Sequence, residues 1–411
     1  MSKKLKILVS CYACSPYRGS EPGMGWNFVK ELSKHHEVHV ITEKEKWQYD
    51  IERYQKENEV SHNLYFYYIK KNRNRKLRKI WPPSYYWFYR VWQKKAYHLA
   101  QKMIKAEDFD LVHQLNMVGY REPGYLWKLS APFVWGPIGG TQNVPWHLFS
   151  VLDLHGKLFY GSRNILNSIQ KHFLKRPYLA TKRSHSELIS ATPDIQKDAL
   201  KLWKKRSHII TEVGSSSQLN TSTNSRLNNQ VLKIVWSGQH TSGKALNILL
   251  QSVALLEPSV KWELHILGVG KQTKQLKHLA NKLGIAPFCN WYGWVAKERA
   301  ENIMAQGHVF CITSLKDLTS TVTIEAISVG LPVVCMDHCG FAYVINESCG
   351  IKIPVEKLKD IRLGFKSAIS LLYNNETKRK ELAEGALKRA KDFSWNKKIE
   401  KLNAIYSNLV G

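Results

Sequence analysis

Residues 314–334 read SLKDLTSTVTIEAISVGLPVV, and this stretch decides the fold. An apolar run at 309–312 precedes it and predicts a buried strand. A short polar loop then leads to a helix that we expect to begin near Ser320 and to stop at Gly330. Pro332 and the apolar residues after it predict the next strand. Strand, loop, helix and strand form the repeating unit of a parallel α/β sheet.

The start of the predicted helix is suited to phosphate. The backbone N–H groups of Ser320, Thr321 and Val322 lack helical partners there, and the helix dipole favours an anion. Asp317 precedes the helix and Glu325 lies inside it, eight positions later. One carboxylate suits sugar hydroxyls and the other ribose hydroxyls. The alternative interpretation is ordinary helix capping by Ser or Thr with a solvated Glu.

A second loop has complementary chemistry. Residues 236–246 read WSGQHTSGKAL, in which a predicted strand enters a loop at Gly238 and Gln239. Lys244 follows at the start of the next predicted helix, as a flexible point charge suited to a diphosphate. A surface turn with a solvated lysine is the alternative.

The whole chain predicts an α/β fold of two doubly wound, Rossmann-like domains facing a central cleft. Its 411 residues exceed one typical core. We expect an N-terminal domain over 1–214, a polar linker at 215–231 and a second domain over 232–385. Residues 386–411 are predicted to form a helix that crosses back to the first domain.

The first half offers weaker candidates for the same cleft. A loop at 19–25 contains Gly23 and Gly25 and is predicted to join the first strand to a helix at Trp26–Lys34. Gly139 and Gly140 follow another predicted strand. His113 ends a strand, which predicts a position near the crevice and a catalytic part. Tight turns and a buried structural histidine are the alternatives.

These motifs together resemble the GT-B glycosyltransferases, specifically the large retaining family 4. The family carries an acid, seven residues, Glu-Ala and a Gly-Leu-Pro-Val-Val run, matched by Asp317, Glu325 and 330–334. Asp317 replaces the family's usual Glu, Gln239 stands where the family has Arg, and Leu115 where many members have a second His. The resemblance implies retaining transfer without a metal ion or other cofactor, from a UDP- or GDP-linked sugar. It assigns the donor diphosphate to Lys244 and to the Ser320–Val322 amides, with Asp317 on the sugar and Glu325 on the ribose. It also implies that the domain over 1–214 binds the acceptor and that the domain over 232–385 binds the nucleotide sugar.

The basic charge predicts a polyanionic partner. The net charge is +28, and no acidic residue occurs between Glu59 and Glu107. Within this gap, residues 70–105 mix lysine and arginine with aromatic side chains, which favours an anionic membrane surface. We therefore expect a cytoplasmic protein, peripheral at the inner face of the cell membrane, with a lipid-linked saccharide acceptor. The alternative interpretation of 70–105 is a solvated basic helix that packs its aromatics inward.

Three functions follow from these observations. The leading one is a glycosyltransferase of surface polysaccharide or glycolipid biosynthesis. A sugar-nucleotide epimerase or a soluble sugar synthase of the same fold is the second, and neither needs the basic aromatic stretch. A nucleic-acid-binding protein is the third. It leaves the spacing of Asp317 and Glu325 unexplained, and no RNA-binding motif is present, so we expect no nucleic acid partner.

Overall fold

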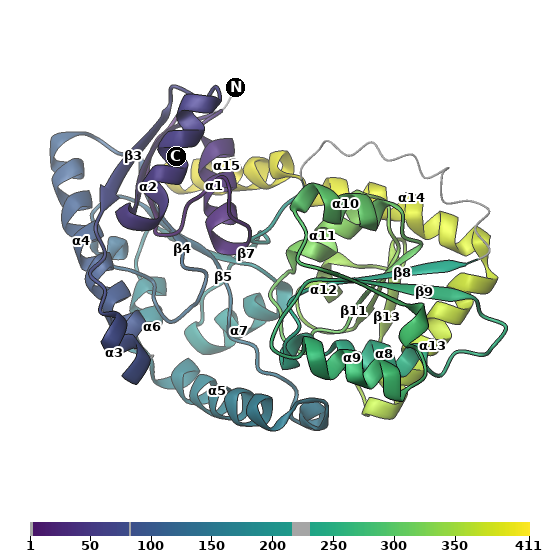
Figure 1. Ribbon diagram of the computed structural model, residues 1–411. Helices are drawn as coiled ribbons and strands as arrows, with labels where there is room; N and C mark the ends of the chain where they lie inside the picture. Colours follow the sequence, from purple (N-terminus) through teal and green to yellow (C-terminus); the bar gives the residue numbers. More distant parts are fainter. Residues whose placement is uncertain (1–2, 82–83, 216–230) are drawn as a thin grey trace. The chain divides into compact units, whose positions relative to one another are not determined.

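The structure is a computed structural model that describes residues 3–81, 84–215 and 231–411. The chain divides into two compact units, and each contains one parallel sheet with helices (Figure 1). Unit 1 consists of Met1–Thr141, Ile169–Glu212 and Trp395–Gly411, and unit 2 of Gln142–Ser168 and Val213–Ser394. Most of the predicted linker, residues 216–230, lies outside the described residues.

Unit 1 contains a seven-stranded sheet in the order β3-β2-β1-β4-β5-β6-β7, with every pair parallel. Strand β1 pairs on one side with β2 and on the other with β4. The first half of unit 1 is built from β1 (Lys6–Cys11), α1 (Ser20–Leu32), β2 (Glu37–Glu43), α2 (Lys44–Glu57), β3 (Leu64–Ile69), α3 (Arg75–Ile80) and α4 (Ser84–Ala106). The rest comprises β4 (Leu111–Asn116), η1 (Leu126–Lys128), β5 (Phe133–Ile138), α6 (Lys175–Thr181), β6 (Ser186–Ser190), α7 (Pro193–Trp203), β7 (His208–Ile209) and α15 (Trp395–Val410).

Unit 2 contains a six-stranded parallel sheet in the order β10-β9-β8-β11-β12-β13. The strand order reverses between β8 and β11, and such a switch point in a doubly wound sheet leaves a crevice at the carboxyl ends of the two strands. The first half of unit 2 comprises η2 (Trp146–Val151), β8 (Leu232–Ser237), η4 (Ser242–Lys244), α8 (Leu246–Val253), β9 (Trp262–Leu267), α9 (Thr273–Lys282), η5 (Ala286–Phe288) and β10 (Cys289–Gly293). The second half comprises α10 (Lys297–Ala305), β11 (Val309–Ile312), α11 (Thr321–Ser328), β12 (Val333–Met336), α12 (Phe341–Val344), β13 (Gly350–Ile353), α13 (Leu358–Asn374) and α14 (Glu376–Asp392).

Each unit completes its core with a segment from elsewhere in the chain. In unit 1, α15 buries apolar side chains, among them Ile399 and Leu402, against α1. In unit 2, Val144 and Leu148 from the 142–168 segment join the core around β8. The helix α5 (Leu154–Phe173) begins in unit 2 and ends in unit 1. The two doubly wound α/β domains predicted from the sequence are confirmed.

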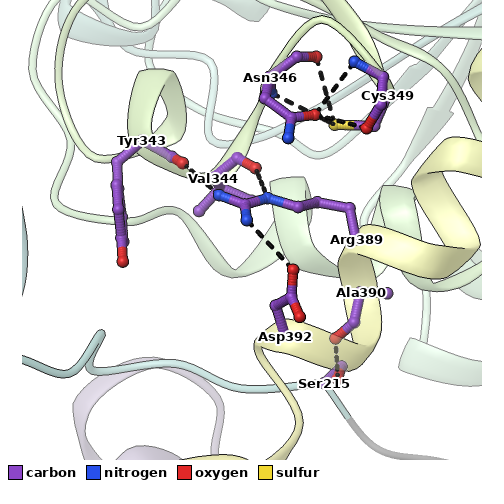
Figure 2. Close-up of polar contacts among 9 residues, drawn as sticks. Ser215, Tyr343, Val344, Asn346, Cys349, Arg389, Ala390 and Asp392 are labelled. Atoms are coloured by element: carbon purple, nitrogen blue, oxygen red, sulfur yellow. Dashed lines mark hydrogen bonds and ion pairs between the residues drawn. The ribbon is translucent and has the colours of Figure 1, made fainter.

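The predicted C-terminal helix is two helices that belong to different units. Helix α14 ends at Asp392 in unit 2, and α15 begins at Trp395 in unit 1. Figure 2 shows how the end of α14 is fixed: the Arg389 guanidinium donates to the backbone oxygens of Tyr343 and Val344, both at 2.9 Å. The Ser215 hydroxyl donates to Ala390 O at 2.9 Å, which ties the chain entering unit 2 to the same helix.

The glycine loop predicted at 19–25 is wrong, because helix α1 begins at Ser20 and contains both Gly23 and Gly25. A Cβ on Gly25 would lie 2.2 Å from Ala13 O and 2.6 Å from Cys11 Sγ. Gly25 thus lets α1 approach the end of β1 closely. This close approach requires the absence of a side chain, and it does not involve a turn.

We predict that Gly25→Ala destabilises unit 1 by about 1–3 kcal/mol, because the added methyl collides with backbone that cannot move freely. Urea unfolding followed by tryptophan fluorescence measures the change. Gly19→Ala is the matched control, since a Cβ there meets nothing within 4 Å. Equal stability of the two variants would contradict the close approach.

Candidate active site

Two loops of unit 2 are joined at the switch point of its sheet. One follows β8 and the other follows β11. The Leu315 N–H donates to Gly243 O at 2.8 Å, and the Thr313 hydroxyl donates to Lys244 O at 2.9 Å. The indole of Trp236 donates to the same hydroxyl at 3.2 Å. These bonds fix the two predicted motifs against each other.

The joined loops place Lys244 beside Asp317. The Lys244 Nζ and an Asp317 carboxylate oxygen form an ion pair and a short hydrogen bond. The side chains remain 28% and 20% exposed, so the pair is accessible to a solute. The N–H of Leu318 donates to the other Asp317 oxygen at 3.1 Å, which orients the carboxylate. An anion entering here meets a cation that is already positioned.

Helix α11 begins directly after this pair. Ser320 precedes it with φ of +70°, a strained conformation for a residue other than glycine, and its side chain makes no capping hydrogen bond. The side chain of Ser320 therefore does not cap the helix. Thr321 is exposed and Val322 is half-buried at the first turn, where N–H groups have no helical acceptor. This helix start suits a phosphate.

Glu325 lies one turn into α11. It is half-buried, and its backbone oxygen accepts from the Val329 N–H at 3.2 Å. Its carboxylate forms no hydrogen bond or ion pair with residues 3–81, 84–215 or 231–411. Burial raises its pKa, an effect that Lys297 opposes and Glu301 reinforces. A partly buried carboxylate without a partner among the described residues is available to hydroxyl donors of a ligand.

Gly238 and Gln239 lie on the first loop as predicted. Gly238 packs on its own strand, since a Cβ there would approach the Trp236 ring at 3.2 Å. Gln239 is exposed, and its backbone oxygen accepts from the Thr241 N–H at 2.8 Å. The Gln239 side chain ends in a neutral amide, whereas the family that the sequence resembles has an arginine at this position.

The predicted residues of the first half lie in unit 1. His113 is fully buried, and both ring nitrogens are engaged, by the Tyr406 hydroxyl at 2.6 Å and by Gly136 O at 2.7 Å. Burial lowers its pKa to about 4, so the ring is neutral. Gly139 and Gly140 follow β5, and Gly139 bridges to Gly119. These contacts hold His113 in the interior, and the catalytic part predicted for it stays a prediction.

Sequence reasoning missed two residues that support the site. Asp153 accepts from the Gln272 amide at 3.0 Å, and the Ser242 hydroxyl accepts from the Asp153 N–H at 3.2 Å. Tyr160 of α5 packs on the loop so closely that a Cβ on Gly243 would lie 2.0 Å from its hydroxyl. Burial raises the Tyr160 pKa, and Asp317 adds to this effect. Both residues come from the 142–168 segment, and no local sequence motif indicates that they lie near the site.

In the part of the chain that the structure describes, no group of three or more His, Cys, Asp or Glu residues is placed to hold a metal ion.

We predict that Glu325→Gln raises the melting temperature at about pH 7 by roughly 2 °C. The pKa of Glu325 is higher in the folded than in the unfolded protein, because burial disfavours the charged carboxylate. Burial of this side chain therefore does not lower the stability below the unfolded pKa, where the group is protonated in both states, and it lowers the stability most above the folded pKa. The gain should therefore fade as the pH falls to about 4. Calorimetry over this range measures it, with the exposed Glu298→Gln as control; equal shifts in both variants would contradict a buried, unpaired carboxylate.

Comparison with known proteins agrees with this geometry. Residues 218–389 match the family model described as Glycosyl transferases group 1. No curated protein sequence matches the chain. Many solved structures match, at low sequence identity.

Three of these structures illustrate the fold. WaaG, a glycosyltransferase involved in lipopolysaccharide biosynthesis, is 18% identical, with 97% of this chain and 99% of that chain covered and a TM-score of 0.60. The lipopolysaccharide outer core galactosyltransferase WaaB is 17% identical, with 98% and 100% covered and a TM-score of 0.65. HepE from Anabaena, solved with UDP, is 15% identical, with 98% and 100% covered and a TM-score of 0.64. The chain thus has the fold of GT-B glycosyltransferases, and residues 218–389 match the Glycosyl transferases group 1 family.

Proposed function

We propose that this protein transfers a sugar, with retention at the anomeric carbon, from a UDP- or GDP-linked donor to a lipid-linked saccharide. The product belongs to a cell-surface polysaccharide or glycolipid. The observation that carries the proposal is the accessible Lys244–Asp317 pair at the start of α11, one turn before the unpartnered Glu325. A diphosphate, a sugar and a ribose each find a suitable group there.

The proposed chemistry depends on electrostatic stabilisation of the leaving group. When the donor binds, Lys244 exchanges Asp317 for the diphosphate, and the N–H groups of Thr321 and Val322 hold the phosphate nearest the helix. Asp317 is then free to accept hydrogen bonds from the donor sugar. The bond between the anomeric carbon and the diphosphate oxygen breaks, and the diphosphate keeps the electron pair. The acceptor hydroxyl oxygen forms the new bond to the anomeric carbon, and its proton passes to the departing diphosphate oxygen.

We propose that this transfer needs no bridging metal ion, because Lys244 and the helix start provide the compensating positive charge. HepE was solved with UDP and with UDP-glucose, which supports a uridine donor as the first to test. The ribose of such a donor is assigned to Glu325.

The acceptor proposal is supported by the basic aromatic stretch at 70–105. Its aromatic residues divide into two groups: Tyr89 and Trp92 are buried in unit 1, whereas Trp81 and Trp87 are exposed. Inward packing, the alternative interpretation, therefore covers only part of the stretch. The exposed rings lie among lysine and arginine side chains of α3 and α4, a mixture that favours an anionic membrane interface. We propose peripheral attachment at the inner face of the cell membrane.

We predict that Lys244→Ala and Glu325→Ala each lower turnover at least about tenfold, or about 1.4 kcal/mol of barrier. Lys244→Ala removes the charge that stabilises the departing diphosphate, and Glu325→Ala removes the ribose contact. The measurement is transfer from a panel of UDP and GDP sugars, followed by proton NMR of the product to read its anomeric configuration. Lys274→Ala, an exposed lysine on α9, is the matched control. Wild-type rates in both site variants would refute the assignment.

We predict that the pair of changes Trp81→Ser and Trp87→Ser weakens binding to anionic vesicles several-fold, because the exposed rings no longer enter the interface. Flotation with phosphatidylglycerol vesicles at low and high salt measures this. Trp294→Ser removes a more exposed ring of unit 2 and should leave binding unchanged. If the wild-type chain does not bind the vesicles, or if its binding does not change with salt, the membrane part of the proposal is removed.

A further inference from the structure

Helix α5 (Leu154–Phe173) carries an apolar face directed away from the protein. Leu154 is 75% exposed, Leu158 67% and Phe173 78%. At about 100° per residue, the exposed apolar residues of the helix fall within an arc of roughly 140°. These residues are Leu154, Leu158, Phe159, Ile165, Leu166, Ile169 and Phe173. Apolar side chains of this size are normally buried, so the face needs a partner.

The opposite face of α5 shows that this orientation is fixed by packing. The Asn164 amide donates to Val144 O at 2.8 Å, and its oxygen accepts from Val144 N–H at 3.1 Å. Gly156 lies against the Ser242 side chain, where a Cβ would approach within 2.4 Å of the hydroxyl. Tyr160 packs on Gly243 from the same face. The polar face is therefore the one that contacts the protein, and the apolar face is left outside.

The charged residues of α5 are all basic. Between Asp153 and Glu187 the chain contains seven Lys and Arg residues and no acidic residue. Lys157 and Arg163 are exposed and border the apolar arc on its two sides, by the same helical spacing. The exposed ring of Trp146, which stacks on Phe149 at 4.6 Å, lies near Gly161 on one border.

We propose that the outer face of α5 docks on an anionic lipid bilayer, with the helix lying in the plane of the interface. Leucine, isoleucine and phenylalanine enter the boundary of the acyl chains, and the flanking lysine and arginine reach the phosphate groups. A second copy of this chain is a poorer partner, because pairing two such faces brings like charges together. In the described parts of the chain, no helix has both the length and the apolar content to cross a bilayer.

This docking has a consequence for the donor site, and here the inference rests on the proposed function. The helix that touches the bilayer also holds the loop of Lys244 through Tyr160 and Gly243. Asp153, directly before the helix, contacts Ser242 of the same loop. Docking through α5 would therefore hold the donor loop close to the surface in which a lipid-linked acceptor resides.

The test is flotation of the full chain with vesicles of phosphatidylcholine, with and without phosphatidylglycerol. The double variant Leu158→Glu, Ile165→Glu places two charges in the apolar arc and should lower partitioning about tenfold or more. The variant Lys157→Glu, Arg163→Glu should lower it only on vesicles that contain phosphatidylglycerol. Leu200→Glu, Leu371→Glu alters two similarly exposed leucines on α7 and α13 and is the matched control.

Unchanged partitioning of the Leu158 and Ile165 double variant would overturn the proposal. A wild-type dimer in light scattering that the same variant abolishes would also overturn it, in favour of self-association. Thermal stabilisation by UDP or GDP is measured on every variant, which separates this proposal from the proposed function. If the Leu158 and Ile165 double variant loses vesicle binding but is still stabilised by UDP or GDP, the result supports docking through α5. If the wild-type chain binds vesicles but neither nucleotide stabilises it, docking through α5 stands and the donor-site assignment is removed.

Discussion

The hydrogen bonds between the loop after β8 and the loop after β11 are the constraint on which the candidate site depends. They join backbone to backbone at Gly243 and Leu315 and place Lys244 beside Asp317. An ion pair of this exposure contributes on the order of 1 kcal/mol. A diphosphate can therefore replace Asp317 at little cost, while the backbone junction keeps the lysine in place. A donor site requires both features: a backbone that stays fixed and a side-chain contact that the ligand can replace.

Much of this unit was predictable because its signals are local. The helix around Glu325 is bounded by Ser320 and Gly330, and the structure begins and ends α11 within a residue or two of them. The strand β3 was not predicted, although its sequence, LYFYYI, is a continuous run of aliphatic and aromatic residues typical of a strand. It lies at the edge of its sheet and is mostly half-buried. The sequence places the start of α1 at Trp26, whereas the helix begins at Ser20. The reason is that glycine in a sequence more often indicates a turn, whereas Gly23 and Gly25 lie in the helix and allow close packing.

The parts of the site that the sequence did not reveal come from distant segments. Asp153 and Tyr160 precede Lys244 by some eighty residues or more, and their contacts with its loop depend on how the 142–168 segment folds into unit 2. The depth of His113 depends in the same way on α15, whose Tyr406 reaches the ring from the other end of the chain. Periodicity places a residue on a strand, but it does not show which distant side chain will occupy the space beyond it.

The distribution of charge favours one class of polyanion over another. Two acid-free stretches, 60–106 and 154–186, hold nineteen Lys and Arg residues, about two thirds of the net charge of +28. Charge that served only solubility would be dispersed among acidic residues. Single-stranded nucleic acid would require aromatic faces for stacking beside the cations, and α5 offers mainly aliphatic leucine and isoleucine. Aliphatic side chains bordered by lysine and arginine find a matching partner in acyl chains bordered by phosphate, so an anionic bilayer accounts for the apolar and the basic groups together.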